Sequence, residues 1–327
     1  MLLLRESDLR ALLTMREVIE AVESGFGALA RGEAIVPDRI QLGIAAHQGV
    51  LLEMPAYADL SGAAALGTKV VTVFERNGSR GLDIVQAVYL LLDCKTGAPL
   101  ALMDGRFITA VRTAATSAVA TRFMSAPGPK RLAVFGAGVQ AQFHIEAMIE
   151  VAEIAQVLIV SRSADRAGAL ADRVTAVHAL PCDLSSADQA VTASDLICTC
   201  TSSPVPLFDG RLLTAGTHIN AVGAFTPSTR EIDTEGVRRA RTIIDAESAA
   251  GREAGEVLIP LSDGVIDQSH VKGTLADVVS GKVAGRETPS DITLFKSCGL
   301  AIEDLVTARL AYARALDQGM GVEVAMS

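Results

Sequence analysis

A glycine-rich turn is the first group of residues with a chemical role that can be recognised. Gly136, Gly138 and Ala141 follow an apolar run at residues 132–135 and precede apolar residues at helical spacing. Strand, tight turn and helix in this order open a dinucleotide-binding unit, in which helix N–H groups bind the phosphates. Gly136 permits the turn, Gly138 lets a pyrophosphate approach, and Ala141 lets the helix pack closely. The alternative is a plain strand-to-helix turn. The predicted phosphate-side residues are Gly136, Gly138, Val139 and Gln140.

The residues after the next strand indicate which dinucleotide is bound. Ser161, Arg162 and Ser163 follow the predicted strand at 156–160. An acidic residue at this point binds the ribose 2′-hydroxyl of NAD, whereas arginine and small hydroxyl groups suit the 2′-phosphate of NADP. The sequence therefore favours NADPH over NADH, with Arg166 as a further cation. The alternative is that Ser161–Ser163 only cap the following helix.

The elements that must position this site alternate between strand and helix from residue 131 to about residue 293. Such alternation predicts a doubly wound parallel sheet, the Rossmann fold, whose ligands bind at the carboxyl ends of the strands. Thr199 and Thr201 end one strand and so are expected at the cofactor cleft, although β-propensity alone would explain them. Asp291–Thr293 is expected to open a last helix at about 298–316. The predicted strands are 131–135, 156–160, 175–179, 195–199, 217–222 and 241–245.

The N-terminal third predicts a different architecture. Ser7–Asp8 can cap one helix, and Thr14–Glu17 forms a capping box that opens a second. Short β-like runs with turn signals between them then indicate an antiparallel sheet. A helix rich in small residues, 109–124, is expected to cross between the domains. The predicted class is α/β, with a discontinuous α+β domain and a Rossmann domain. Their ranges are 1–124 with 299–327 and 125–298, and the antiparallel strands are 40–42, 50–54, 64–73, 84–92 and 100–103.

Composition limits the partners. The formal net charge of −9 argues against a nucleic-acid partner. Because the start at residues 1–6 is short and soon charged, we expect no signal peptide, and no apolar stretch reaches the roughly 18 residues that a membrane span needs. Its five scattered cysteines lack a C-x-x-C pair, which is typical of reduced thiols in a cytoplasm. Cys198 and Cys200 are interpreted as core packing and His144 as a satisfied helix residue, and no metal site is predicted.

Four further blocks, together with the glycine turn, carry a family likeness. Taken in order, the blocks 67–70, 104–115, 136–141, 218–223 and 295–304 resemble the ornithine cyclodeaminase/mu-crystallin family over nearly the whole chain. That family includes ornithine and lysine cyclodeaminases, an alanine dehydrogenase, and ketimine or 1-pyrroline-2-carboxylate reductases. The resemblance implies a homodimer joined through the substrate-binding domains, whose sheets form a closed barrel.

The resemblance also implies a substrate clamp. In that family a lysine and two arginines bind the substrate carboxylate, which implies Lys69, Arg112 and Arg39 here. Lys69 lies in an apolar strand, where a cation is unfavourable unless it is paired, and Arg112 could bind a carboxylate with two prongs. The alternative for each is a structural ion pair. Lys69 could also donate or relay a proton, and Glu53 is a further candidate beside the substrate nitrogen. Cofactor contacts are implied for Thr113 and Val222, and contacts with the nicotinamide for Ser297 and Gly299.

One departure from the family pattern argues against one of the family's activities. Cyclodeaminases have an aspartate two residues after the glycine at position 223, and this chain has Phe225 there. A phenyl ring cannot carry a proton, but it can form an apolar wall beside an imine. The sequence thus favours an NADPH-dependent reductase of 1-pyrroline-2-carboxylate or 1-piperideine-2-carboxylate, which forms L-proline or L-pipecolate. The alternatives are an ornithine cyclodeaminase, an alanine dehydrogenase, and a non-catalytic NADP(H)- or small-ligand-binding protein.

Overall fold

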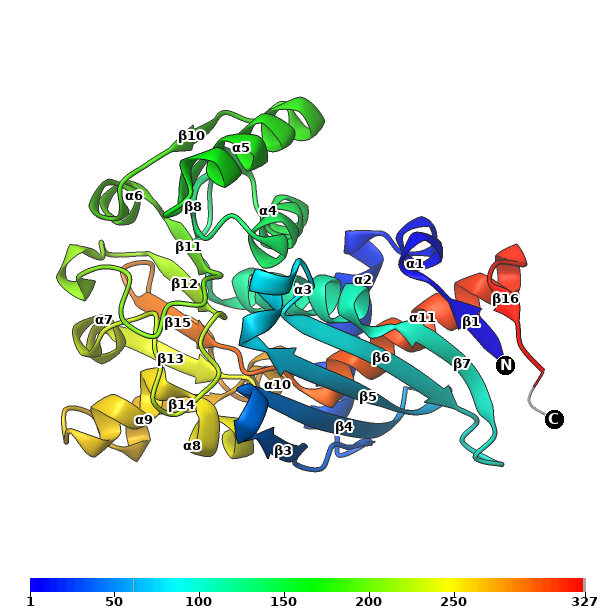
Figure 1. The fold of residues 1–327 in the computed structure, drawn as a ribbon. Helices are drawn as coiled ribbons and strands as arrows, with labels where there is room; N and C mark the ends of the chain where they lie inside the picture. The colour runs from blue at the N-terminus through cyan, green and yellow to red at the C-terminus, as the bar shows by residue number, and fades with distance from the viewer. Residues whose placement is uncertain (61, 326–327) are drawn as a thin grey trace. The chain divides into compact units, whose positions relative to one another are not determined.

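The computed structural model describes residues 1–60 and 62–325, and the chain divides into two compact units (Figure 1). The first unit comprises Met1–Thr113 and Leu300–Ser327, and the second comprises Ala114–Gly299. The division falls within helix α3 (Gly105–Met124), which therefore contributes residues to both. In the described part of the chain, no helix is both long and apolar enough to cross a membrane.

The first unit contains an eight-stranded sheet in the order β16-β1-β7-β6-β5-β4-β2, with β3 also paired to β4. The strand pairs are antiparallel except for β1 and β7, so the predicted antiparallel sheet is confirmed. Sequence periodicity did not reveal the short strands β1, β2 and β16. The strands are β1 (Leu2–Leu4), β2 (Ala34–Ile35), β3 (Ile40–Ile44), β4 (Gly49–Asp59), β5 (Ala64–Phe74), β6 (Val85–Leu92), β7 (Pro99–Asp104) and β16 (Val322–Glu323).

Helices cover one face of this sheet. Helix α11 (Ala301–Gln318) contacts β4, β5 and β6 and packs on α2 (Met15–Ala30). Burial alternates along β4, where Leu52 and Met54 face the helices. The opposite face is apolar and exposed at Ile40 on β3 and Val88 on β6. These two residues lie in one row across the sheet, because Ile40 pairs with Glu53, Glu53 with Val70 and Val70 with Val88.

The two predicted N-terminal helices are present, with one boundary corrected. The capping box of α2 is confirmed, because Thr14 and Glu17 exchange backbone-to-side-chain hydrogen bonds of 3.3 and 3.4 Å. Helix α1 (Glu6–Leu12), however, begins before Ser7. Its N-cap residue is Arg5, whose N–H donates to the Asp8 carboxylate at 2.9 Å, so Asp8 acts from within the first turn.

The second unit is a doubly wound parallel sheet, as predicted. The spatial order of its strands is β10-β9-β8-β11-β12-β15-β13-β14. Along the chain, β8 comes first, β9 and β10 extend the sheet to one edge, and β11 then pairs with the other side of β8. Nucleotides bind in such sheets where the order reverses, here between β8 and β11. The strands are β8 (Lys130–Phe135), β9 (Ile154–Val160), β10 (Cys182–Leu184), β11 (Leu196–Thr199), β12 (His218–Ala221), β13 (Ala240–Ile244), β14 (Val271–Thr274) and β15 (Ile292–Lys296).

Helices connect these parallel strands. Figure 1 labels each of them from α4 to α10. They are α4 (Val139–Val151), α5 (Ala164–His178), α6 (Ala187–Ala193), α7 (Thr234–Arg239), α8 (Glu247–Glu253), α9 (Gly255–Ser262) and α10 (Leu275–Val279).

Two sequence-based predictions in this unit were wrong. The strand predicted at 175–179 is the end of α5, which buries Val174 on its apolar face and stops at left-handed Ala179; β10 follows instead. Residues 291–293 lead into strand β15 rather than into a helix, and α11 starts at Ala301. Strand β15 is buried throughout, and a short buried run lacks the periodicity that distinguishes strand from helix.

Candidate functional site

Two cations and two carboxylates form a buried cluster in the first unit. Lys69 lies on β5, Arg112 on α3, and Glu303 and Asp304 in the first turn of α11. The Lys69 ammonium nitrogen lies 2.9 and 2.8 Å from the two oxygens of Asp304. Arg112 donates from Nε to Asp304 at 2.9 Å and from Nη1 to Glu303 at 2.6 Å. The structure therefore joins both predicted clamp cations through carboxylates of the protein itself.

Sequence reasoning did not select Glu303 and Asp304 as site residues. A usable signal was present, because two adjacent acidic residues stand in an otherwise apolar stretch at 300–306. Both side chains are fully buried, and buried charges need partners. Glu303 has a second role, because its Oε1 accepts the N–H of Leu300 at 2.9 Å and so caps α11.

The charges in this cluster shift its proton equilibria. Burial and the neighbouring Arg112 lower the pKa of Lys69 to about 8, although Asp304 acts in the opposite direction. Burial also opposes the charge on Arg112, but Asp304 and Glu303 outweigh it and raise the pKa of that guanidinium. A lysine with a pKa near 8 can hold or release a proton close to neutral pH, as a general acid must.

Tyr89 lies beside the cluster with an unused hydroxyl. It stands opposite Lys69 in the β5–β6 register and is fully buried. Within the described residues its hydroxyl oxygen has no hydrogen-bond partner. A Cβ on Gly67 would lie 2.5 Å from that oxygen, so the glycine makes room for Tyr89. Burial and Asp304 raise the pKa of Tyr89, which keeps the phenol protonated.

The structure does not bring Glu53 to this cluster. Glu53 pairs with Val70 and so faces away from the helices, whereas its neighbour Met54 pairs with Lys69 on the covered face. Arg39 is the residue before β3 and is half-buried. The cation–carboxylate cluster thus contains two of the three predicted clamp residues.

The glycine turn in the second unit has the shape that a dinucleotide needs. Gly136 has a φ of +114°, and a Cβ there would lie 2.7 Å from the carbonyl oxygen of Cys200, so both conformation and space require glycine. Gly138 is the N-cap of α4 and supplies no side-chain cap. A Cβ on Gly138 would meet no protein atom within 4 Å. The space in front of the N-terminal N–H groups of α4 therefore fits a phosphate, and Val139 is exposed there.

The residues after β9 combine a cap with two exposed cations. Ser163 caps α5 by accepting the N–H of Arg166 at 3.4 Å, so the capping role that the sequence left open is present. The Ser161 hydroxyl accepts the N–H of Ser163 at 3.2 Å. Arg162 and Arg166 are exposed, and neither forms an ion pair with any residue that the structure describes. Both cations can therefore bind an anion from solution.

Thr199 and Thr201 both bind a buried carboxylate, that of Glu231. The hydroxyl of Thr199 donates to it at 2.7 Å, and the N–H and hydroxyl of Thr201 donate at 2.8 and 2.6 Å. The N–H of Gly223, after β12, donates at 2.7 Å. Because Thr199 is fully buried, its hydroxyl supports the end of β11 from inside the protein.

A second layer of charge lies beneath Glu231. Glu256 accepts the Glu231 N–H at 2.9 Å and pairs with Lys296 at 3.1 Å, and all three residues are fully buried. Lys296 also donates to the carbonyl oxygen of Ala224. That contact fixes the backbone next to Phe225, whose side chain is 38 % exposed.

The other predicted cofactor residues lie near strand ends or on α3. Asp245, after β13, accepts the N–H of Gly299 at 2.6 Å and that of Cys298, which shapes the loop from Ser297 to Gly299. The N–H of Val222 donates to the Thr199 carbonyl at 3.2 Å. Thr113 donates its hydroxyl to the Thr109 carbonyl at 2.7 Å within α3.

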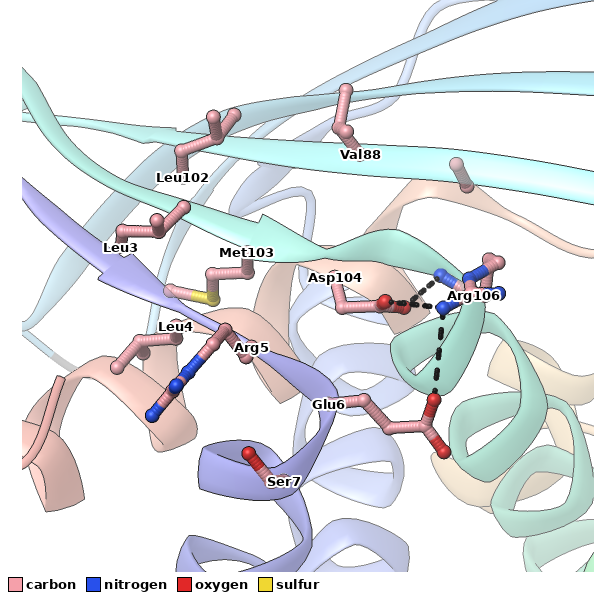
Figure 2. A pocket seen from close by; sticks show the side chains of 11 residues that line it. Leu3, Leu4, Arg5, Glu6, Ser7, Val88, Leu102, Met103, Asp104 and Arg106 are labelled. Carbon is pink, nitrogen blue, oxygen red and sulfur yellow. Dashed lines mark hydrogen bonds and ion pairs between the residues drawn. The ribbon is translucent and has the colours of Figure 1, made fainter. Parts of the chain in front are cut away.

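The first unit also contains a hollow of about 430 Å³. It opens between β1, β6 and β7, and Figure 2 shows Arg106 at its wall joined to Asp104 and Glu6. Arg106 lies 3.0 Å from Asp104 and 3.7 Å from Glu6, and Arg5 is paired with Asp8. The charged side chains that line this hollow are therefore all in ion pairs.

His144 is a core residue, as the sequence indicated. Its ring bonds to the Ser117 hydroxyl at 3.0 Å and the Gln140 carbonyl at 2.8 Å, and burial lowers its pKa to about 4. Cys198 is likewise buried in the second unit. Among the residues that the structure describes, no group of three or more His, Cys, Asp or Glu side chains could hold a metal ion.

Residues 1–319 match the model of the ornithine cyclodeaminase/mu-crystallin family. The structure of Thermococcus litoralis Delta(1)-pyrroline-2-carboxylate reductase with NADH and L-proline is similar, with a TM-score of 0.96, 42% identity, and 99% and 100% of the two chains covered. An archaeal alanine dehydrogenase dimer with bound NAD has a TM-score of 0.94 and 31% identity over 100% and 99%. Ketimine reductase mu-crystallin of Rattus norvegicus is 38% identical over 307 residues, 94% of each chain.

Proposed function

The chain belongs to the ornithine cyclodeaminase/mu-crystallin family, and on that premise we propose that it reduces small cyclic imino acids with a nicotinamide cofactor. It is an oxidoreductase that acts on the C=N bond. The substrates we assign are 1-pyrroline-2-carboxylate and 1-piperideine-2-carboxylate, with L-proline and L-pipecolate as products. The observation that carries the proposal is the buried pair of cations, Lys69 and Arg112, in a chain whose second unit fits a dinucleotide.

The substrate carboxylate is assigned to Lys69 and Arg112. An ammonium has three N–H donors and a guanidinium has five, so both cations can serve an added carboxylate while they remain on Asp304. Glu303 and Asp304 hold both side chains in place before the substrate arrives. The resulting fixed orientation of the imine contributes to the rate by proximity. Arg39 remains a proposed third contact, and Glu53 has less support because it lies on the other face of the sheet.

Imine reduction adds one hydride to carbon C2 and one proton to nitrogen. A bound nicotinamide supplies the hydride. Lys69 holds a proton near neutral pH and is the proposed donor or relay for the imine nitrogen. Phe225 is proposed as an apolar wall beside the imine. Because no carboxylate stands at that position, deamination of ornithine is not assigned to this chain.

NADPH is the proposed cofactor. Arg162 and Arg166 are exposed, and Ser161 and Ser163 add hydroxyl groups, so this end of β9 can bind a 2′-phosphate. The two similar structures hold NADH and NAD, and the preference is therefore proposed for this chain alone. Thr201, Val222, Ser297, Gly299 and Thr113 remain proposed contacts of the dinucleotide.

A homodimer formed through the first unit is proposed as well. One face of its sheet is covered by helices, whereas the other presents apolar side chains to solvent at Ile40, Leu42 and Val88. Burying such a patch against a second copy would be favourable, and two of these sheets could close into one barrel. The mass of the protein in solution tests this proposal.

The deciding experiment is a steady-state assay with NADPH and NADH against a panel of substrates. The panel contains both cyclic imines, pyruvate with ammonia, and ornithine with the oxidised cofactor. Proline or pipecolate formation from the imine supports the proposal. Amination of pyruvate faster than reduction of the imines would indicate an alanine dehydrogenase instead. Release of ammonia from ornithine would indicate a cyclodeaminase, and cofactor binding without turnover would indicate a binding protein.

A further inference from the structure

The Glu231 carboxylate lies between two loops that follow adjacent parallel strands. Its Oε1 accepts the N–H and hydroxyl of Thr201, after β11, at 2.8 and 2.6 Å. Its Oε2 accepts the N–H of Gly223, after β12, at 2.7 Å, and the Thr199 hydroxyl, also at 2.7 Å. In all four hydrogen bonds the carboxylate is the acceptor, so Glu231 links the end of β11 and the loop after it to the loop after β12.

The two loops approach each other so closely that only glycine fits at position 223. A Cβ on Gly223 would lie 2.0 Å from the carbonyl oxygen of Thr201 and 2.7 Å from both Glu231 oxygens. Beneath them, Glu256 holds the Glu231 backbone, and Lys296 balances the charge of Glu256. Carboxyl ends of parallel strands near a topological switch point are where such sheets bind dinucleotides.

We propose that Glu231 is a positioning residue for the cofactor: it fixes the backbone of Thr201 and Gly223 in the arrangement that the dinucleotide binds. This inference rests on the proposed function, because it needs a nicotinamide dinucleotide at these strand ends. Glu231 itself does not touch the cofactor. It acts through the N–H groups it holds and the two loops that they belong to.

The donors around Glu231 make a substitution by glutamine informative. Each carboxylate oxygen accepts one main-chain N–H, and a main-chain N–H cannot turn round to accept a bond. In Glu231→Gln the side-chain amide must therefore face one of these N–H groups in either orientation, donor against donor. The size of the side chain is unchanged, so only the hydrogen-bonding pattern differs.

The experiment compares the parent protein with Glu231→Gln, Thr201→Val and the control Glu235→Gln. Glu235 is in an ion pair with Arg238 on the surface of the same unit. The Kd of NADPH and of NADH is measured by the fluorescence of the bound cofactor, and the KM of the imine at saturating cofactor. For Glu231→Gln we expect both Kd values to rise at least tenfold and the imine KM to stay within twofold.

Thr201→Val removes one hydroxyl but keeps the main-chain N–H, so a smaller rise in Kd is expected even if Glu231→Gln does not fold. Glu235→Gln should match the parent. If Glu231→Gln folds and keeps the parental Kd values, the inference is overturned but the proposed function is not. If Glu231→Gln is unfolded, parental Kd values in Thr201→Val overturn the inference in the same way. A parent protein that binds neither dinucleotide overturns the proposed function as well.

Discussion

Asp304 holds Lys69 by both oxygens, at 2.9 and 2.8 Å, although the two residues are 235 positions apart in the chain. The same carboxylate also binds Arg112, so one side chain orients both proposed clamp cations. Removing one partner from a buried ion pair leaves an uncompensated charge in the core.

Asp304→Asn should therefore weaken the fold. We expect a loss of about 3–5 kcal/mol in the free energy of unfolding, measured by urea denaturation. Asp317→Asn on the exposed side of the same helix is the matched control and should change stability by less than about 0.5 kcal/mol. Equal stability of the two variants would show that Asp304 does not support the buried cations.

Lys69 should set the alkaline limit of activity. Its pKa is about 8, lowered by burial and by Arg112, so the proton to be donated is present below pH 8 and lost above it. We expect kcat/KM for imine reduction to fall above about pH 8. A bound substrate carboxylate favours the ammonium form, so the corresponding limb in kcat should lie at higher pH. Lys69→Arg should remove the limb because arginine keeps its proton. An unchanged limb in that variant would assign the titration to another group.

Arg112→Lys tests the carboxylate contact. Lysine keeps the charge but loses the two-pronged geometry that now reaches Glu303 and Asp304. We expect kcat/KM to fall about tenfold to a thousandfold, which corresponds to about 1–4 kcal/mol of transition-state stabilisation. NADPH affinity should be unchanged. A cyclic imine without the carboxylate should lose little from the same substitution, and a loss as large as that of the full substrate would remove Arg112 from this role.

Arg162→Ala tests the choice of cofactor. The exposed guanidinium is expected to bind the 2′-phosphate, so its removal should raise the KM for NADPH about tenfold or more and leave that for NADH nearly unchanged. Ser161→Asp should shift the preference toward NADH, because an acid repels the phosphate and accepts a hydroxyl. If both cofactors lost affinity equally, Arg162 would have only a structural role.

Phe225 predicts which reaction is absent. Loss of ammonia from ornithine needs a proton carrier beside the amine, and the residues around Phe225 (Ala224, Thr226 and Pro227) provide no carboxylate. The parent protein should release little or no ammonia from ornithine. Phe225→Asp should slow imine reduction by placing a charge at an apolar wall, whereas Phe225→Leu should retain most of the activity. Stoichiometric ammonia and proline from ornithine would contradict this assignment.

Local signals in the sequence were sufficient for the glycine turn at Gly136, the capping box at Thr14 and the change from an antiparallel to a parallel sheet. They were insufficient where burial or partners distant in the sequence determine the secondary structure. Strand β15 is buried on both faces, so its sequence lacks the alternation that distinguishes a strand from a helix segment. Residues 175–179 contain the β-branched Thr175 and Val177, yet 175–178 form the last, mostly exposed turn of α5.

The same limit applies to the candidate site. Lys69 and Arg112 could be selected from the family resemblance, and the position of Lys69 in an apolar strand agreed with it, but the identity of their partners depends on tertiary structure. Glu303 and Asp304 meet them only because α11 packs on β5. Glu231 had no sequence signal at all, since its contacts lie in loops after two separate strands.

The discontinuity of the first unit has a consequence for biosynthesis. Lys69 leaves the ribosome 235 residues before its counter-ion Asp304, a delay of roughly 10–50 s at typical elongation rates. During that interval the sheet of the first unit lacks α11 and the carboxylates that neutralise its cations. Residues 114–299 are complete before α11 is made, so the nucleotide-type unit can fold first. A nascent chain would then finish its cation cluster last, and until that moment it exposes the apolar strand faces that α11 will cover.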